Sequence, residues 1–252
     1  MTFLVCIPAR YGSSRLPGKA LLKIGDKTIV RRVYEQCAES SATDIMVATD
    51  DTRIVEEVES FGGRAFLTDE DIQSGSDRVA SMLKQMAIPQ DAVVVNVQGD
   101  EPFVSPSVIE QVAKGVTCDR KAVHTVCESL DPRVSSDPSV VKVVRDKSNR
   151  ALYFSRSSIP CTLNMKDEAS LGDIFRKHVG IYGYTVGVLE KFVSTTPSDL
   201  ELIEQLEQLR FLQMGVTIFA PDAVDACGAG VDTVEDYKQA CRMWEARWVE
   251  SS

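Results

Sequence analysis

Apolar positions in the first hundred residues follow two alternating periods. Short apolar runs have the length and β-branched content of buried strands, and between them apolar residues recur every three or four positions, as on an amphipathic helix. The strand-like runs are 3–7, 44–50, 64–67 and 92–97, and the helical spacings begin near 28, 51 and 79. This alternation predicts crossover connections and an α/β fold with a mostly parallel, Rossmann-like sheet.

After residue 117 the periods become less regular. We expect strands over 140–145, 152–156, 179–184 and 216–220, and helices over 200–214 and 234–248. The stretch 160–173 has no clear period, which predicts a surface loop. The chain contains no internal repeat or long linker. We therefore predict one domain over 1–252, in which residues 117–232 extend the sheet and add a flap or dimerisation region.

The loop between the first strand and the first helix has the most informative composition. It reads IPARYGSSRLPGK over residues 7–19. Its cations and hydroxyls belong to Arg10, Arg15, Lys19, Ser13 and Ser14. In an open α/β sheet such a loop lies at the carboxyl edge of the strands, where glycines let the backbone approach an anion and cations supply opposing charge. The alternative is a solvated basic connection of the kind common on protein surfaces.

Composition narrows the choice of ligand. The 252 residues carry a net charge of −9 and give a pI of about 4.9, which argues against general affinity for nucleic acid. A basic loop on an acidic molecule favours a small anion. No apolar run approaches the roughly 18 residues of a membrane span, and the first residues lack the features of a signal peptide. Seven cysteines without a CxxC pair fit reduced thiols in the cytoplasm.

Acidic residues at two predicted turns form a candidate metal site. The run NVQGDEP closes the most apolar strand and places Asp100 at the same sheet edge as the basic loop. Asp232 lies in a Gly-rich turn before the last helix and could complete a site with Asp100. Mg²⁺ prefers carboxylate oxygens and shares its coordination shell with substrate phosphates. The structural alternatives are an Asp turn at residue 100 and a helix cap by Asp232 or Thr233.

Other polar patches suit a ligand with several hydroxyl groups. The run QSGSDR, at 73–78, begins a predicted helix. Such a helix start can bind a phosphate or the polar edge of a base. The structural alternative is that Ser74 or Ser76 caps the helix. Further along, the candidates are Arg156 for a carboxylate, Glu207 and Gln208 for hydroxyls, and His178, which fits a structural role equally well.

Taken in order, these patches resemble the sugar-acid cytidylyltransferases, and most closely the 3-deoxy-manno-octulosonate (Kdo) cytidylyltransferase family. The matching segments within residues 7–236 are IPARYGSSRLPGK, VATDD, QSGSDR, VNVQGDEP, VKVV, ALYFSRSSIP, KHVGIYGY, LEQLR and GVDTVED. The resemblance implies a nucleotide-diphospho-sugar transferase fold. It implies transfer of CMP from CTP to the anomeric hydroxyl of Kdo, with release of pyrophosphate, for lipopolysaccharide synthesis. It also implies Mg²⁺, a cytoplasmic location and a homodimer.

The resemblance further implies roles for individual residues. The implied CTP-binding residues are Arg10, Ser13, Ser14, Arg15, Lys19, Ala48, Thr49, Asp50, Ser74, Gly75 and Arg78. The implied sugar-binding residues are Gln98, Arg156, His178, Tyr182, Glu207 and Gln208. Asp100 and Asp232 would bind Mg²⁺, and together with Arg10 and Lys19 they form the implied catalytic set.

Other functions stay open at this stage. The acceptor could be an 8-amino analogue of Kdo or another sugar acid, because Cys161 and the residues after it depart from the family pattern. The chain could instead be a catalytically silent nucleotide-binding homologue, against which the presence of all four catalytic residues argues. A dinucleotide-dependent oxidoreductase is disfavoured, because no G-x-G-x-x-G follows the first strand.

Overall fold

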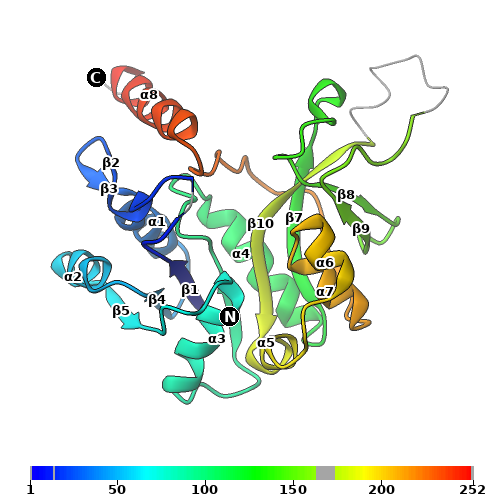
Figure 1. The fold of residues 1–252 in the computed structure, drawn as a ribbon, viewed down its shortest axis with the longest axis horizontal. Helices are drawn as coiled ribbons and strands as arrows, with labels where there is room; N and C mark the ends of the chain where they lie inside the picture. Colours follow the sequence, from blue (N-terminus) through cyan, green and yellow to red (C-terminus); the bar gives the residue numbers. More distant parts are fainter. Residues whose placement is uncertain (1, 14, 163–173, 251–252) are drawn as a thin grey trace.

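A single large sheet runs through the computed structural model, which describes residues 2–13, 15–162 and 174–250. Its strands are β1 (Leu4–Ala9), β4 (Asp44–Thr49), β5 (Arg64–Leu67), β6 (Val93–Asn96), β7 (Val123–Ser129), β8 (Lys142–Arg145), β9 (Ala151–Ser155), β10 (Arg176–Thr185) and β11 (Ile218–Phe219). Within these residues the main path has the order β11-β7-β10-β6-β1-β4-β5, with β8 beside β10 and β9 beside β8 (Figure 1). A separate hairpin joins β2 (Lys23–Ile24) to β3 (Lys27–Thr28).

The strands of the first half are parallel. β1 pairs with β4 on one side and β6 on the other, and Cys6 lies opposite both Met46 and Asn96. β10 then runs antiparallel between β6 and β7. Because β1 and β6 point the same way in this register, the loops that follow them leave the sheet side by side at its carboxyl edge.

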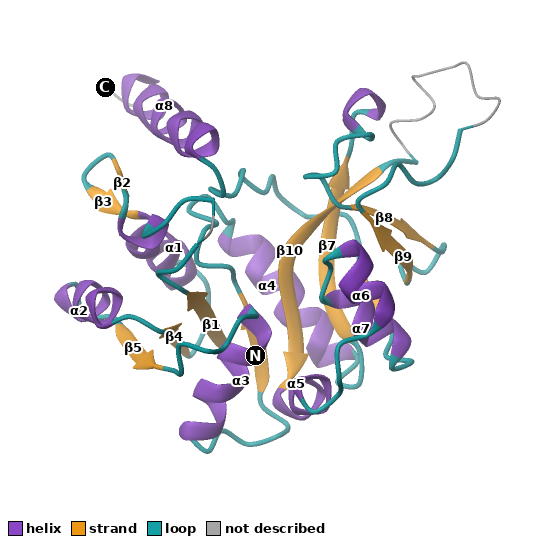
Figure 2. Ribbon diagram, in the orientation of Figure 1, coloured by secondary structure: helices purple, strands orange, loops and turns teal. Residues whose placement is uncertain are grey.

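Helices cover both faces of the sheet and make three layers (Figure 2). They are α1 (Ile29–Ala38), α2 (Thr52–Ser60), α3 (Gly75–Gln85), α4 (Pro106–Cys118), α5 (Val186–Val193), α6 (Asp199–Glu204), α7 (Gln208–Gln213) and α8 (Val234–Glu250), with short 3₁₀ turns at Lys19–Leu21 and Pro132–Val134. Successive strand residues point to opposite faces. Val5 and Val95 therefore pack with α1, α2 and α4, whereas Cys6 and Val94 pack with α3, α5 and α7.

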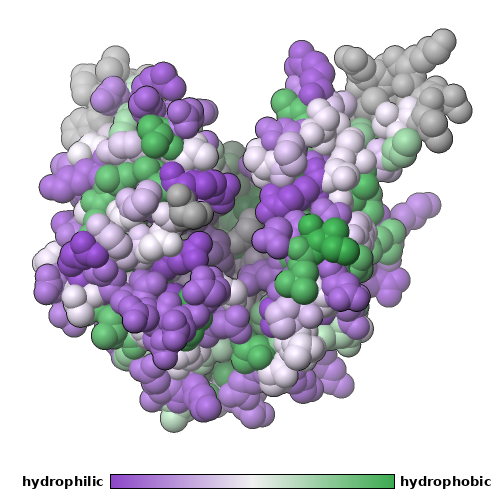
Figure 3. All heavy atoms as spheres, in the orientation of Figure 1, coloured by the Kyte–Doolittle hydropathy of each residue, from purple (hydrophilic) through white to green (hydrophobic). Residues whose placement is uncertain are grey.

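The predicted elements of the first half are confirmed, and those of the second half are confirmed with one change. The helix expected over 200–214 is two helices, α6 and α7, because Gln205 adopts a left-handed backbone with φ of 54° that ends α6. Most of the loop predicted over 160–173 lies outside the described residues. No helix of the described chain is long and apolar enough to cross a membrane. The surface is hollowed between the part that carries α1 and the part that carries α6 (Figure 3).

Candidate active site

The loops after β1 and β6 touch at the carboxyl edge of the sheet. The Gly99 amide donates a hydrogen bond to the Pro8 carbonyl at 3.2 Å. A Cβ atom at position 99 would lie 2.7 Å from that carbonyl oxygen, so only glycine allows this approach without a backbone shift. The contact brings Asp100, the residue after Gly99, against the loop that carries Lys19.

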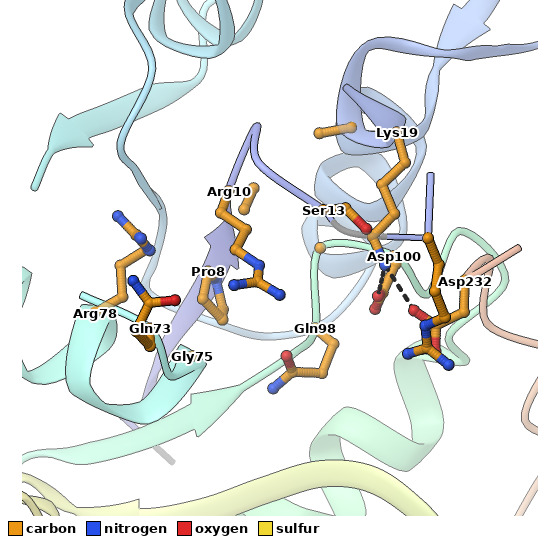
Figure 4. A pocket seen from close by; sticks show the side chains of 14 residues that line it. Pro8, Arg10, Ser13, Lys19, Gln73, Gly75, Arg78, Gln98, Asp100 and Asp232 are labelled. Atoms are coloured by element: carbon orange, nitrogen blue, oxygen red, sulfur yellow. Dashed lines mark hydrogen bonds and ion pairs between the residues drawn. The ribbon is translucent and has the colours of Figure 1, made fainter. Parts of the chain in front are cut away.

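Lys19 lies between the two predicted metal ligands (Figure 4). Its Nζ donates hydrogen bonds to Asp100 Oδ2 and, at 2.8 Å, to Asp232 Oδ1. Arg15 Nη2 donates to the other oxygen of Asp232 at 3.0 Å. The side chain of Lys19 is only 13% exposed, so this ion pair is much less screened than a surface one. Residues far apart in the sequence thus converge on one ammonium group.

The cap of α8 leaves the Asp232 carboxylate available for this contact. Thr233 Oγ1 accepts a hydrogen bond from the Asp236 amide at 3.1 Å, and Asp236 Oδ2 accepts one from the Thr233 amide at 2.9 Å. The helix is therefore capped by Thr233 and Asp236. The capping interpretation of this turn is confirmed for Thr233, and the metal-binding interpretation of Asp232 stays a prediction.

The charge balance keeps Lys19 and Asp232 ionised at neutral pH. Burial by itself would lower the pKa of Lys19, but the charges and hydrogen bonds of Asp100 and Asp232 outweigh burial and raise that pKa above its ordinary value. Burial would likewise raise the pKa of Asp232, yet the hydrogen bond and charge of Lys19, with the charge of Arg15, hold it below its ordinary value. Lys19 and Asp232 therefore form an ion pair rather than a hydrogen bond between neutral groups.

The donor set at this cluster fits a magnesium ion. Asp100 and Asp232 both contact the same nitrogen atom, so two hard carboxylate oxygens already converge on a position where a cation is stabilised. No group of three or more His, Cys, Asp or Glu side chains in the described residues could enclose a metal ion. Two acids without a full cage match the way Mg²⁺ is bound jointly by one or two carboxylates and substrate phosphates.

The cations of the basic loop line a cavity of about 210 Å³ beside this cluster. Figure 4 shows Arg10 between the Asp100 side and the Arg78 side of this cavity. The predicted CTP-binding residues on its wall are Arg10, Ser13, Arg15, Lys19, Gly75 and Arg78. Gln73, Gln98, Asp100 and Asp232 also line it. Positive side chains therefore surround a space that is open to an anion.

Asp50 holds two walls of this cavity together. Its Oδ1 accepts a hydrogen bond from the Tyr11 amide at 2.9 Å, and its Oδ2 accepts one from Arg78 Nη2 at 3.1 Å. Ser74 caps α3 by accepting from the Asp77 amide at 3.0 Å, which confirms the capping alternative for this residue. Asp50 and Ser74 support the cavity without being part of its lining.

Two more predicted nucleotide-binding positions, Ala48 and Thr49, are not on the cavity wall either. Ala48 and Thr49 are fully buried in β4, since helices cover both faces of this internal strand. Their neighbours are core side chains and the β5 backbone, and their contact with CTP stays a prediction. Ser14, another predicted position, lies outside the described residues.

A second cavity, of about 690 Å³, opens beside the first and contains all the predicted sugar-binding residues. Both cavities are lined by Gln98, Asp100 and Asp232, so they meet at the Lys19 cluster. The predicted residues on its wall are Gln98, Arg156, His178, Tyr182, Glu207 and Gln208. They lie just after β6, just after β9, on β10, and at the start of α7.

Several of these side chains already have partners. Glu207 Oε1 accepts a hydrogen bond from Ser76 Oγ at 2.8 Å, and burial raises the pKa of this carboxyl despite that bond. The guanidinium of Arg156 donates to the carbonyls of Glu204, Pro138 and Gln205. Arg156 thus contacts three carbonyls of two backbone segments, and the expected bidentate pair with a substrate carboxylate would require it to release some of them.

Sequence reasoning gave no role to two charged residues of the larger cavity. Glu101 follows Asp100, and burial together with the charge of Asp100 raises its pKa to about 8. Lys177, which precedes His178, also lines this cavity and lies 3.6 Å from Glu128. Glu101 and Lys177 are the sequence neighbours of Asp100 and His178. That position in the sequence was the only feature that could have indicated them as site residues.

The fold, together with the match to a family of cytidylyltransferases, identifies the protein as a nucleotidyltransferase. The structure of UDP-glucose pyrophosphorylase with UDP-glucose superposes with a TM-score of 0.68 over 98% of this chain and all of that one, at 16% identity, which shows the shared nucleotide-diphospho-sugar transferase fold. The profile of the Cytidylyltransferase family matches residues 4–218.

Comparison with closer relatives identifies the family. A 3-deoxy-manno-octulosonate cytidylyltransferase of Pseudomonas fluorescens is 46% identical over 97% of this chain and 98% of its own length. One from Vibrio campbellii is 44% identical over 94% and 95%. The structure of CMP:2-keto-3-deoxy-manno-octonic acid synthetase complexed with CTP matches at 38% identity, with a TM-score of 0.89 over 98% of this chain and 99% of that one. The chain belongs to the 3-deoxy-manno-octulosonate cytidylyltransferase family and is an enzyme.

Proposed function

We propose that this enzyme transfers CMP from CTP to the anomeric hydroxyl of Kdo and releases pyrophosphate. The observation that carries the proposal is the Lys19–Asp100–Asp232 cluster at the junction of two cavities. One cavity is lined by cations suited to a triphosphate, and the other by polar groups suited to a sugar acid. The named substrates of the relatives support the same pair.

We assign the phosphate chemistry to the basic loop. Arg10, Arg15 and Lys19 place positive charge where negative charge increases as pyrophosphate leaves. The junction of the two cavities lets a hydroxyl approach the α-phosphorus while the phosphates stay on the other side. Asp100 and Asp232 would hold Mg²⁺, which when bound neutralises phosphate charge and lowers the pKa of a nearby hydroxyl.

We assign recognition of the sugar acid to the larger cavity. Gln98, Tyr182, Glu207 and Gln208 offer hydrogen-bonding groups to its hydroxyls. Lys177 supplies a positive charge near the same wall for the carboxylate. This division leaves Arg156 to hold the loops that shape the cavity, in accordance with its backbone partners.

The test is pyrophosphate release from CTP and Mg²⁺ with a panel of acceptors. We expect release with Kdo, and little with sialic acid or with no acceptor. Faster release with the 8-amino analogue of Kdo would instead identify that compound as the acceptor. No release with any acceptor would favour a silent homologue and would overturn the proposal.

We also propose that the chain, as one domain, forms a homodimer through residues 117–232. Of the eight exposed large apolar side chains in the described chain, six fall in this region: Val134, Leu152, Ile174, Leu202, Ile203 and Val224. The pair on α6 belongs to an apolar patch visible in Figure 3. Light scattering after gel filtration should give twice the monomer mass of 27.7 kDa, and a monomer would contradict this assembly.

A cytoplasmic location is part of the same proposal. All seven cysteines are free, four of them partly or fully exposed, which suits a reducing compartment.

A further inference from the structure

A threonine behind the larger cavity contacts the ring of His178. Thr125 Oγ1, on β7, lies 3.0 Å from His178 Nε2, on the neighbouring strand β10. The same oxygen lies 3.0 Å from the carbonyl oxygen of Val179 and donates its proton there. Thr125 is 1% exposed and His178 is 7% exposed, so water cannot readily replace either partner.

Counting protons determines the direction of both hydrogen bonds. A hydroxyl has one proton to donate, and a carbonyl has none. The contact between Thr125 and Val179 is therefore a hydrogen bond only if Thr125 donates. Thr125 then presents a lone pair to His178, so Nε2 of the imidazole has to carry a proton for that contact to be favourable.

The ring of His178 is neutral, which leaves its other nitrogen without a proton. Burial, followed by the charge of Lys177, lowers the pKa of His178 to about 3. Since a neutral imidazole has one N–H, a proton on Nε2 makes Nδ1 a pure hydrogen-bond acceptor.

Nδ1 is the nitrogen that is accessible from the larger cavity. In the described chain, the buried side-chain nitrogens and oxygens without a partner are His124 Nε2 and Gln208 Nε2. Nδ1 of His178 also has no hydrogen-bond partner in the described chain. It is not one of these buried atoms, and His178 lines the larger cavity, so Nδ1 is exposed to that cavity. The rings of Phe154, at 4.9 Å and 76°, and of Tyr182, at 5.4 Å, fix the imidazole plane.

We propose that Thr125 is a positioning residue that holds His178 in the Nε2–H form, so that Nδ1 accepts a hydrogen bond from a hydroxyl of the sugar acid. This role rests on the proposed function. The Nε2–H form makes Nδ1 selective for a substrate group that donates a hydrogen bond. An ether, carbonyl or carboxylate oxygen at the same place would direct its lone pairs at the lone pair of Nδ1. Thr125 selects the substrate without touching it.

The tautomer can be measured without any substrate. Two-bond ¹H–¹⁵N spectra of uniformly labelled protein report the protonation of each ring nitrogen, and the chain has only two histidines. His178→Gln assigns the signals by removing one set. We expect a protonated Nε2 and a bare Nδ1 in the wild type and in Thr125→Ser. Thr125→Val, which keeps the shape and removes the hydroxyl, should give a mixture of both forms. A proton on Nδ1 in the wild type would overturn the inference, whatever the enzyme's substrate.

Steady-state kinetics with Kdo test the acceptor role. Thr125→Val should raise the KM for Kdo roughly tenfold, as expected for one misdirected hydrogen bond, while the KM for CTP and kcat stay close to wild type. Thr125→Ser should restore the KM for Kdo. An unchanged KM in Thr125→Val, despite an altered tautomer, would refute the role of Nδ1. Absence of any turnover of Kdo by the wild type would overturn the proposed function and this sugar contact, and the free-protein spectrum would still decide the tautomer.

Discussion

At the scale of single residues, we expect the carboxylate of Asp100 to be required for catalysis. Asp100→Asn removes one charge from the predicted metal site, and Lys19 keeps its bond to Asp232. We expect kcat to fall by roughly 10²–10³-fold, while the circular dichroism spectrum stays unchanged. Pyrophosphate release at saturating Mg²⁺ and CTP measures the effect.

Asp91, at the other end of β6, offers a matched control. Asp91 is exposed just before β6, at the end opposite Asp100, and has no described ion pair. Asp91→Asn should keep wild-type turnover. If Asp100→Asn also turned over at the wild-type rate, Asp100 would have no part in the mechanism.

The buried imidazole of His178 should make stability depend on pH. Its folded pKa of about 3 lies below the ordinary value of 6.5, so the unfolded state takes up a proton first as the pH falls. This contribution is fully present above pH 6.5 and is lost between 6.5 and 3. From pH 7 to 5 the wild type should lose about 2 kcal/mol of unfolding free energy from this residue.

Comparison with His178→Gln separates the contribution of His178 from those of the other titrating groups. Glu101, for example, has a raised pKa, so its contribution to stability changes with pH in the opposite direction. Urea unfolding of both proteins at pH 7 and 5 gives the difference between their pH dependences. Equal slopes would show that the folded protein protonates His178 as readily as the unfolded chain does.

The residue scale also shows what the sequence could and could not predict. Residue types and order predicted that Arg10, Lys19 and Asp100 lie near one another, because the ends of parallel strands meet at one edge. Asp232 joined this set only as a possible partner of Asp100 and through the family resemblance, since it follows no strand. The sequence could not reveal that the Arg156 guanidinium is engaged by backbone carbonyls, since those partners depend on the tertiary path of two loops. The proposed role of Thr125 could not be predicted for the same reason, because its contact with His178 crosses two strands.

At the scale of elements, the contact between α4 and β10 depends on a missing side chain. A Cβ on Gly183 would lie 2.6 Å from Val112 Cγ1 and 2.8 Å from Val116 Cγ2, inside the packed layer. Gly183→Ala should therefore destabilise the protein by about 1–3 kcal/mol, because α4 must move outward or its valines must leave their rotamers.

Gly180 supplies the control on the same strand. A Cβ there would have no atom within 4 Å, so Gly180→Ala should change the unfolding free energy by no more than about 0.5 kcal/mol. Chemical denaturation of the two variants gives the comparison. Equal stabilities would mean that α4 accommodates the methyl group at no cost.

Elements were predictable where their period was regular. The β1–β6 half follows from short apolar runs that alternate with helical spacings, since the internal strands β1, β4 and β6 are buried on both faces. The break at Gln205 was not predictable, because an apolar stripe continues across it and only the left-handed backbone ends the helix. The antiparallel insertion of β10 between β6 and β7 likewise depends on long-range pairing that no local pattern encodes.

At the scale of the whole molecule, binding of Mg²⁺ and CTP should stabilise the fold. A ligand at a hundred times its Kd adds about 2.7 kcal/mol, which for a chain of this size raises the Tm by about 5–10 °C. Differential scanning calorimetry with and without Mg²⁺–CTP measures the shift. The shift should be smaller for Asp100→Asn, and no shift in the wild type would contradict a nucleotide site in the smaller cavity.

The ion pair between Lys19 and Asp232 joins residues 213 positions apart in the sequence. During synthesis the parallel strands and the basic loop emerge first, and the second acid emerges only after nearly the whole chain has been made. A nascent chain can therefore hold the parts of a nucleotide pocket long before it can consume CTP. The same separation in sequence suits the protein to a split-enzyme experiment. Two fragments divided before residue 232 would each be inactive alone, and activity after mixing would report that they reassemble.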